Sequence, residues 1–409
     1  MSKIAVMGFG TVGSGTVELF YKHKDTLNAK LGTDLDIKYI LEIRDFPDSP
    51  YKDKIVKDIE TIISDPEITV AAEVMGGVNP AYDFVMKCLG RGISVVTSNK
   101  ELVAKKGDIL LKTARENGCN FFFEASTGGA IPIIRPLHEC LAADEIVGVE
   151  GILNGTTNFI LTKMLGEGMS FEKALALSQE LGYAEKDPTA DISGADSCRK
   201  ICILGSLAFG RHIYPEWVYT EGIEKITRAD AAYAKAYNSS IKLIAKAKRI
   251  EDGTIAVSVR PEFVCNTSQI SSVSDVFNGI SVYGEAAGEL MFYGRGAGKL
   301  PTASAVVADI AEAAAANGTS PTLKWESSDN NDFLADIMDI PAAFYIRTAD
   351  TDKITVSKQL GGFGVEFLER DGAPKNEIAF VVQNITEHTL DRRLHSLGVK
   401  EFSKIIING

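Results

Sequence analysis

The sequence contains few cysteines, no excess of basic side chains and no long hydrophobic run. Its six cysteines include no CxxC pair, and several lie in apolar stretches, which favours reduced core thiols over a disulfide framework or a zinc site. Lysine and arginine number 43 against 55 acidic residues, and the resulting net charge of -12 argues against a nucleic-acid partner. No window reaches about 18 apolar residues, the length of a membrane span. Because the N-terminus leads directly into Lys3-Ile4-Ala5-Val6, we expect a cytoplasmic protein with no membrane partner.

The first third of the chain alternates short apolar runs with longer amphipathic segments. This is the βαβ rhythm of a parallel doubly wound sheet of the Rossmann type, in an α/β protein. With 409 residues, two or three domains are expected. The expected strands are residues 4–7, 37–41, 70–75, 94–97 and 120–124.

Farther along, the pattern predicts a mixed α+β domain followed by a third unit. Helices are expected at residues 171–181, 196–208, 229–248 and 301–317, the last stopped by Gly318, and strands at 254–259 and 281–283. The third unit should be a split βαββαβ, ferredoxin-like arrangement: strand 342–348, helix 353–360, strands 363–369 and 378–382, helix 386–397, strand 400–407. The predicted domains are residues 1–130, with helix 301–317 packing back on them, residues 131–318, a linker at 319–340, and residues 341–409.

A GxGxxG pattern, Gly8 to Gly13, stands between the first strand and the first helix. In that place the glycines permit a tight turn and a close approach to a pyrophosphate, which the helix N-terminus faces. Dinucleotide binding is therefore favoured over a simple glycine turn. After the second strand, Glu42 suits the ribose hydroxyl of NAD and Arg44 the 2′-phosphate of NADP, so the choice of cofactor stays open.

The segment Thr97-Ser98-Asn99-Lys100 follows another strand. Lys100 should then stand at the carboxyl end of the sheet, where doubly wound folds bind ligands, and its amine could serve acid–base chemistry. A solvated lysine at a helix start is an equally good interpretation.

Two glycine turns have less specific patterns. Glu124 precedes the turn Thr127-Gly128-Gly129, and a carboxylate beside turning carbonyls could bind a hard cation, although a simple capped turn is slightly favoured from the residues alone. The turn at residues 294–299 leads into a helix with proline in its first turn and could present backbone amides to an anion, or merely connect two elements.

The richest stretch is the loop Gly182-Tyr183-Ala184-Glu185-Lys186-Asp187-Pro188-Thr189-Ala190-Asp191, followed by a helix with Asp196 and Lys200. These two residues are four apart, so they share a helix face. An exposed ion pair is the alternative, but the small and apolar neighbours of the pair favour a buried, functional one. A lysine held near carboxylates could donate a proton to a carbonyl that receives hydride.

Taken together, these motifs resemble homoserine dehydrogenase over essentially the whole chain. The most specific strings are NGTTNFILTKM at residues 154–164, GYAEKDPTADISGADSCRK at 182–200 and GRGAGKLPTASAVVADI at 294–310. The resemblance implies interconversion of L-homoserine and L-aspartate 4-semialdehyde with NAD or NADP, on the way to threonine and methionine.

The resemblance also implies roles for individual residues. Lys200 would be the catalytic lysine, oriented by Asp196, with Lys100 beside the cofactor and substrate as the other possible proton donor. Glu185, Asp191 and Asp196 would bind the substrate. A sodium ion would be held by Glu124 and the carbonyls of Thr127, Gly129 and Ile131. The cofactor would be bound by Gly8, Gly10, Thr11, Val12, Gly13, Arg44, Thr97, Lys100, Gly182 and Gly298.

The C-terminal unit resembles an ACT regulatory domain, but Thr348-Ala349-Asp350-Thr351-Asp352 stands where such domains usually carry a Pro-Gly turn for an amino-acid effector. We therefore expect a role in subunit association, in a homodimer or homotetramer, rather than threonine binding. From the residues alone, two alternatives are an amino-acid dehydrogenase of other specificity and a non-catalytic cofactor-sensing protein. Neither accounts for the loop at 182–191 together with Asp196 and Lys200.

Overall fold

The computed structural model describes residues 2–316, 319–320 and 323–408, which divide into two compact units. The first comprises Met1–Val147, Cys202–Trp217 and Tyr283–Asp329, and the second comprises Gly148–Ile201, Val218–Val282 and Asn330–Gly409. This division differs from the predicted domain boundaries, because residues 131–147 lie with the N-terminal unit and no separate C-terminal unit is present. Among the described residues, no helix is long and apolar enough to cross a membrane. All six cysteines are free; Cys88, Cys119, Cys198 and Cys202 are buried, whereas Cys140 and Cys265 are exposed rather than part of the core.

The first unit is built on a six-stranded parallel sheet with the order β3-β2-β1-β4-β5-β6. This is the Rossmann order, in which ligands bind at the carboxyl ends of the strands beside the switch between β1 and its two neighbours. The predicted strands are confirmed, with a short additional strand, β3. The bounds are β1 (Ser2–Met7), β2 (Leu35–Leu41), β3 (Ile55–Val56), β4 (Ile68–Glu73), β5 (Ser94–Thr97) and β6 (Phe121–Phe122).

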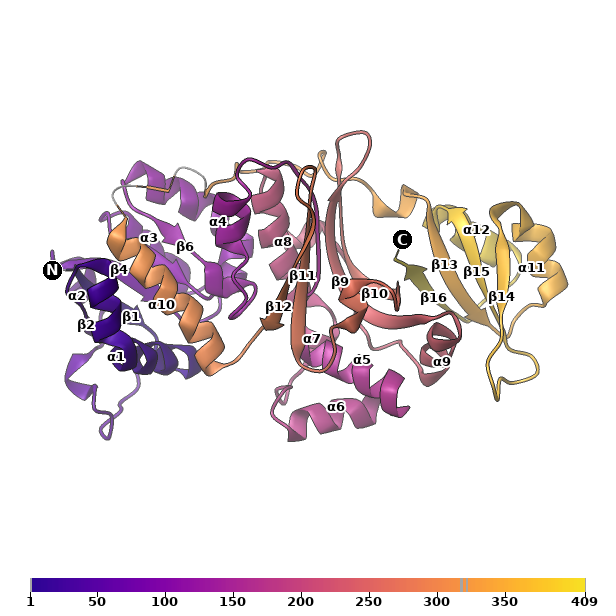
Figure 1. Ribbon diagram of the computed structural model, residues 1–409, viewed down its shortest axis with the longest axis horizontal. Coiled ribbons are helices and arrows are strands. Elements are labelled where there is room, and N and C mark those ends of the chain that lie inside the picture. Colours follow the sequence, from indigo (N-terminus) through magenta and orange to yellow (C-terminus); the bar gives the residue numbers. More distant parts are fainter. Residues whose placement is uncertain (1, 317–318, 321–322, 409) are drawn as a thin grey trace. The chain divides into compact units, whose positions relative to one another are not determined.

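Helices flank this sheet, and α10 lies beside α1 (Figure 1). Residue Gly15 of α1 lets the two helices approach closely, since a Cβ there would lie 2.8 Å from the side chain of Lys299. The late helix α10 contacts α1 of the first unit, and its expected stop at Gly318 lies outside the described residues. The bounds are α1 (Thr11–Leu31), α2 (Ile59–Ile63), α3 (Ala81–Leu89), α4 (Lys100–Glu116) and α10 (Lys299–Ala315), with β12 (Gly288–Arg295) preceding α10.

The second unit contains a mixed sheet with the order β11-β7-β9-β10-β16-β13-β15-β14, and β8 pairs with β10. Helices α5 and α9 pack on β9. The bounds are β7 (Ile146–Ile152), β8 (Tyr219–Thr220), β9 (Ser239–Arg249), β10 (Ile255–Cys265), β11 (Phe277–Gly284), α5 (Gly155–Glu167), α6 (Phe171–Glu180), α7 (Thr189–Ile192), α8 (Ala195–Phe209) and α9 (Arg228–Ala236). The part of α8 through Ile201, which includes Asp196 and Lys200, belongs to this unit.

The prediction of one long helix at residues 229–248 was wrong. Helix α9 ends at Ala236, and Asn238, with a φ of 50°, turns the chain into β9. The apolar residues of β9 recur at every second position from Ile241 to Ala247, mostly alternating with lysine, which is the period-2 sequence pattern of a strand, and residues 241–245 are buried on both faces. The strand pairs along its whole length with β10.

The C-terminal segment has the predicted βαββαβ order: β13 (Ala342–Thr348), α11 (Lys353–Leu360), β14 (Val365–Leu368), β15 (Ile378–Ile385), α12 (Glu387–Ser396) and β16 (Phe402–Ile407). Its two helices and four strands enclose an apolar core that includes Phe344, Phe380 and Leu390. Strand β16 pairs in parallel with β10, which explains why the segment does not separate from the second unit.

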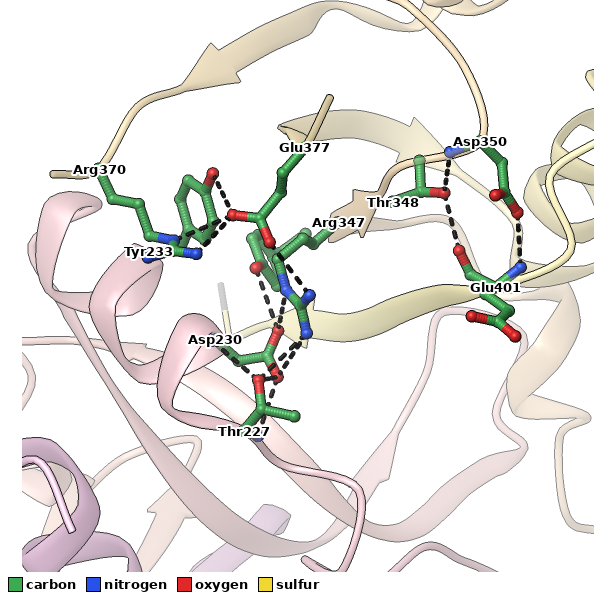
Figure 2. Close-up of polar contacts among 10 residues, drawn as sticks. Thr227, Asp230, Tyr233, Arg347, Thr348, Asp350, Arg370, Glu377 and Glu401 are labelled. Carbon is green, nitrogen blue, oxygen red and sulfur yellow. Dashed lines mark hydrogen bonds and ion pairs between the residues drawn. The ribbon is translucent and has the colours of Figure 1, made fainter. Parts of the chain in front are cut away.

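A buried carboxylate, Asp230 of α9, fastens this segment to the rest of the unit (Figure 2). It accepts hydrogen bonds from Tyr345 Oη at 3.1 Å and from Arg347 Nε at 3.0 Å, both on β13, and from the backbone N–H and hydroxyl of Thr227. Beside it, Glu377 accepts from Arg347 and from Tyr233. The C-terminal segment is therefore joined to the rest of the second unit by strand pairing and by a charged, hydrogen-bonded cluster.

Candidate active site

The glycine turn after β1 requires glycine for steric reasons. A Cβ on Gly13 would lie only 2.1 Å from the carbonyl oxygen of Gly8, which itself has a φ of 104°. Gly10 is the N-cap of α1 and offers no side-chain acceptor, so the first N–H groups of the helix, from Thr11 and Val12 onward, are available to an anion. This local geometry agrees with the predicted pyrophosphate cradle.

Glu42, at the carboxyl end of β2, is fully engaged by the chain itself. Its Oε2 accepts from Phe9 N at 3.1 Å and Arg44 Nη2 at 2.9 Å, and its Oε1 accepts from the N and Nε of Arg44 at 3.0 and 3.1 Å. These bonds, those from Arg44 foremost, lower the pKa of Glu42 to about 2. The side chain of Arg44 is 62% exposed against 7% for that of Glu42, so the guanidinium is the group presented to solvent.

Thr97 and Lys100 flank the carboxyl end of β5. The hydroxyl of Thr97 is buried and donates to Glu73 Oε2 at 2.6 Å. Its side chain therefore links the ends of β5 and β4 and does not point into solvent. Asn99 caps α4 by accepting from Leu102 N, and Lys100 is the first residue of that helix, as predicted. Burial raises the pKa of Glu73, a residue that the sequence analysis missed although an acid within the apolar run 70–75 was visible.

The second glycine turn ends at Gly298, the N-cap of α10, with a φ of 126°. The next residue, Lys299, forms an ion pair with Glu18 of α1 at 2.7 Å. Because α10 lies beside α1, the N-termini of both helices belong to one region of the first unit, and both lack a side-chain cap. The turn therefore offers a second set of backbone amides, as the sequence indicated.

Glu124 is buried and binds backbone amides of its own segment. Its Oε1 accepts from Ile133 N and Ile134 N at 2.6 and 2.8 Å, and its Oε2 accepts from Arg135 N at 2.9 Å. Asp309 of α10 accepts from Glu124 N at 2.9 Å and from Arg135 at 3.1 Å. Burial, together with the charge of Glu124, raises the pKa of Asp309 well above its usual range.

In the second unit, Lys200 and Asp196 form the buried pair that the sequence predicted. Lys200 Nζ lies 2.7 Å from Asp196 Oδ2 and donates to the carbonyl oxygen of Leu153 at 2.6 Å. Both charged residues are at most 5% exposed, unlike a surface ion pair. The geometry holds an ammonium group at a fixed point beside a carboxylate, which suits general acid catalysis.

Asn154 joins this pair to the loop that precedes α8, and the sequence analysis did not single it out. Its Nδ2 donates to Asp191 Oδ1 at 2.7 Å and to Asp196 Oδ2 at 3.0 Å. The signal was present, since Asn followed by Gly-Thr-Thr is a helix-start pattern. Asp191 is thus brought to the cluster, whereas Glu185 and Gly182 are exposed in the loop, Glu185 accepting from Gln179 through its backbone carbonyl.

Two family models cover most of the chain. The model for homoserine dehydrogenase matches residues 132–311, and the model for its NAD-binding domain matches residues 8–124. The homoserine dehydrogenase of Synechocystis sp. is 37% identical over 434 aligned positions, covering 99% of this chain and 98% of the relative. The crystal structure of a homoserine dehydrogenase from Thiobacillus denitrificans has a TM-score of 0.87 at 30% identity and covers 100% and 98% of the two chains. A hyperthermophilic archaeal homoserine dehydrogenase mutant in complex with NADPH has a TM-score of 0.66 at 28% identity, covering 79% and 99%.

A dinucleotide-binding sheet in one unit and a buried lysine–carboxylate pair in the other define an oxidoreductase that uses a nicotinamide cofactor. The family models and the full-length relative identify the family of this oxidoreductase. The chain belongs to the homoserine dehydrogenase family, and it interconverts L-homoserine and L-aspartate 4-semialdehyde in amino-acid biosynthesis. This excludes the two alternatives, an amino-acid dehydrogenase of other specificity and a non-catalytic sensor.

Proposed function

We propose that Lys200 is the proton donor of aldehyde reduction and that Asp196 and Asp191 form the polar wall of the substrate site, with Glu185 joining from the loop. The observation that carries this proposal is the buried contact of Lys200 with Asp196 and the Leu153 carbonyl. The cofactor supplies hydride to the aldehyde carbon. The ammonium of Lys200 gives its proton to the alkoxide oxygen, and in the reverse direction the neutral amine takes the proton of the alcohol. Lys100, at the start of α4, would act on the cofactor side.

The glycine turn fits a dinucleotide, because its Gly13 approaches Gly8 closely and its helix N-terminus is uncapped. We further propose that the cofactor is NADP in preference to NAD. A carboxylate has about four acceptor positions, and Glu42 already accepts four hydrogen bonds, so it has little capacity left for a ribose hydroxyl. Arg44 is exposed and held in place by Glu42. An exposed guanidinium suits a 2′-phosphate.

Arg44→Ala should raise the KM for NADPH by about 10- to 100-fold, the value of a hydrogen bond to a charged group, and leave the KM for NADH nearly unchanged. Initial rates followed by absorbance of the reduced nicotinamide test this, with the exposed Arg91→Ala as the control. An equal rise for both cofactors would mean that Arg44 acts only through Glu42 and the glycine turn, and would contradict the assignment.

We also propose a monovalent cation, sodium, at Glu124 with the carbonyls of Thr127, Gly129 and Ile131. Two observations fit a cation. Asp309 and Glu312 both contact the guanidinium of Arg135, and Glu124 accepts from the backbone N–H of the same residue, so three carboxyl groups gather around one arginine. In the described part of the chain, Thr127 Oγ1 is buried without a hydrogen-bond partner. A bound cation would offset the excess negative charge and order this turn.

If so, exchanging Na⁺ for a large organic cation at fixed ionic strength should lower the stability of the enzyme by about 1–3 kcal/mol, the linkage expected of a ligand present well above its Kd. Glu124→Gln should remove most of that dependence, and Glu139→Gln, an exposed residue of the same segment, should keep it. Thermal melting in the two salts is the measurement. Equal melting temperatures in both salts for the unaltered enzyme would refute the site.

For the C-terminal segment we propose an ACT-like domain without an effector site. Asp350 accepts from Glu401 N at 2.8 Å (Figure 2). It also accepts from Lys400 N at 2.8 Å, and these two bonds lower the pKa of Asp350. Asp352 caps α11 by accepting from Ile354 N and Thr355 N. The chain's own carboxylates thus take the backbone donors that the carboxylate of a free amino acid would need.

Threonine should therefore give no saturable inhibition of the intact enzyme, even at concentrations several times the Kd with which amino-acid effectors usually bind. Initial rates across a threonine titration, with homoserine held near its KM, test this. Saturable inhibition by threonine, altered in strength by the Asp350→Gly substitution, would contradict the proposal.

We instead propose that β14, at the end of the sheet order, contributes to association in a homodimer or homotetramer. Six free cysteines are consistent with a reducing, cytoplasmic location.

A further inference from the structure

Asn154 occupies the point where β7 gives way to α5, and its side-chain amide is fixed by the helix it caps. The Oδ1 atom accepts from Thr157 N at 2.9 Å and from Thr157 Oγ1 at 3.1 Å. Because the oxygen is committed to these donors, Nδ2 must face the opposite way, toward the carboxylates of α7 and α8. The residue is 5% exposed, so water does not compete freely for these bonds.

The two hydrogens of that amide serve two carboxylates. Asp191 Oδ1 lies 2.7 Å from Nδ2 and Asp196 Oδ2 lies 3.0 Å from it. Two carboxylates brought this close repel each other, and a like charge nearby disfavours ionisation. An amide donor placed between them offsets the repulsion and fixes their separation.

The same stretch of chain also holds the lysine. Asp196 Oδ2 is shared between the Asn154 amide and Lys200 Nζ, and the carbonyl of the preceding residue, Leu153, accepts from Nζ. Lys200 is therefore held from two sides by adjacent residues, directly by Leu153 and through Asp196 by Asn154.

We propose that Asn154 is a positioning residue of the catalytic machinery, whose amide keeps Asp191 and Asp196 ionised side by side and thereby fixes the Lys200 ammonium for proton transfer. The inference rests on the proposed role of Lys200. It gives Asn154 a second task beyond capping α5, and the two tasks can be separated because they use different atoms of one side chain.

The charges around Asp191 determine the expected pH effect. Burial raises the pKa of Asp191, the bond from Asn154 lowers it, the charge of Asp196 raises it and that of Lys200 lowers it, and the hydroxyl of Thr156 on α5 also lowers it. Without the amide, Asp191 should protonate nearer to neutral pH. The Lys200 ammonium then loses a neighbouring negative charge on the acid side, so the acid limb of the kcat/KM profile should move to higher pH.

Asn154→Ser tests the proposal, because serine caps helices about as well as asparagine but cannot bridge the carboxylates. We expect kcat to fall by about 10- to 10²-fold, the scale of a misplaced catalytic group. The acid limb should move up by about one pH unit, the equivalent of one lost bond to a charged group. The cofactor KM should change little, because the glycine turn belongs to the other compact unit. Asn154→Asp keeps the cap but adds a third carboxylate, and should move the limb at least as far.

Ser170→Ala is the matched control, since Ser170 caps the neighbouring helix α6 with one bond to Lys173 N. It should leave the pH profile unchanged. If Asn154→Ser and Asn154→Asp both fold and retain the kcat and acid limb of the unaltered enzyme, Asn154 is only a cap and the inference is overturned. Should Lys200→Ala keep near-normal kcat, the role proposed for Lys200 fails first, and the inference fails with it. A profile altered in both Asn154 variants, with Lys200→Ala inactive, supports both statements.

Discussion

Replacing Lys200 with alanine is expected to lower kcat and kcat/KM by about 10²–10⁴-fold, the usual contribution of general acid–base catalysis. The methyl group leaves the Leu153 carbonyl and Asp196 without their shared donor. Among the described residues, no other side chain donates to both of these acceptors and could replace the Lys200 ammonium. Steady-state rates in both directions of the reaction provide the measurement.

Cofactor affinity should survive this change, because the glycine turn and Arg44 belong to the other compact unit. Fluorescence titration of NADPH should give a Kd close to that of the unaltered enzyme. Lys163→Ala is the matched control, since Lys163 pairs with Glu167 on the exposed side of α5. A Lys200→Ala enzyme with near-normal kcat would transfer the role of proton donor to Lys100.

Asp230→Ala should give the largest loss of stability, about 3–5 kcal/mol, because it leaves a partly buried guanidinium and a buried tyrosine hydroxyl without their acceptor. Equilibrium unfolding in urea, followed by circular dichroism, would measure it. Glu369→Ala is the control: its partner Lys353 is exposed, and such pairs contribute about 0–1 kcal/mol. A loss no larger than that of the control would mean that β10–β16 pairing alone holds the segment.

The Asp230 contact also has a pH dependence of known sign. Burial raises the pKa of Asp230, but the bonds from Arg347 and Thr227 outweigh it, so the pKa is lowered in the folded chain. A carboxyl with a depressed folded pKa contributes stability above its unfolded pKa of about 3.9 and loses it as the pH falls further. The difference between the unaltered enzyme and Asp230→Ala should therefore be constant near neutral pH and shrink below about pH 4.

The sequence predicted the first unit well, because local signals and tertiary structure agree there. Each apolar run became a strand of the parallel sheet, and the glycine turn stands where the pattern predicted it. In β9 the signals conflicted. Ala and Lys favour helix by propensity, and residues 229–236 are helical, so the recurrence of apolar residues at every second position from Ile241 to Ala247 was overlooked.

For the site, side-chain identity was more predictable than side-chain partnership. Asp196 and Lys200 could be paired because four residues on a helix fix their geometry. Asn154 is 42 residues from Asp196 in sequence, and only the folded chain brings the two together. Likewise, Glu42 and Arg44 were treated as competitors for the cofactor, whereas the structure makes them partners, since the acid holds the arginine.

Neither compact unit is continuous in sequence, and this affects the order in which the chain can fold during synthesis. Helix α10 packs on α1 and is part of the first unit. This unit therefore stays incomplete until about residue 315 has left the ribosome. The second unit needs β16, at residues 402–407, to pair with β10, which was made some 140 residues earlier, as the register of Glu262 with Ile406 requires. Contacts this distant close slowly and leave apolar surface exposed for longer. Ribosome-bound chains that end before residue 400 should therefore keep the second unit sensitive to protease and dependent on chaperones, even after the N-terminal strands have formed.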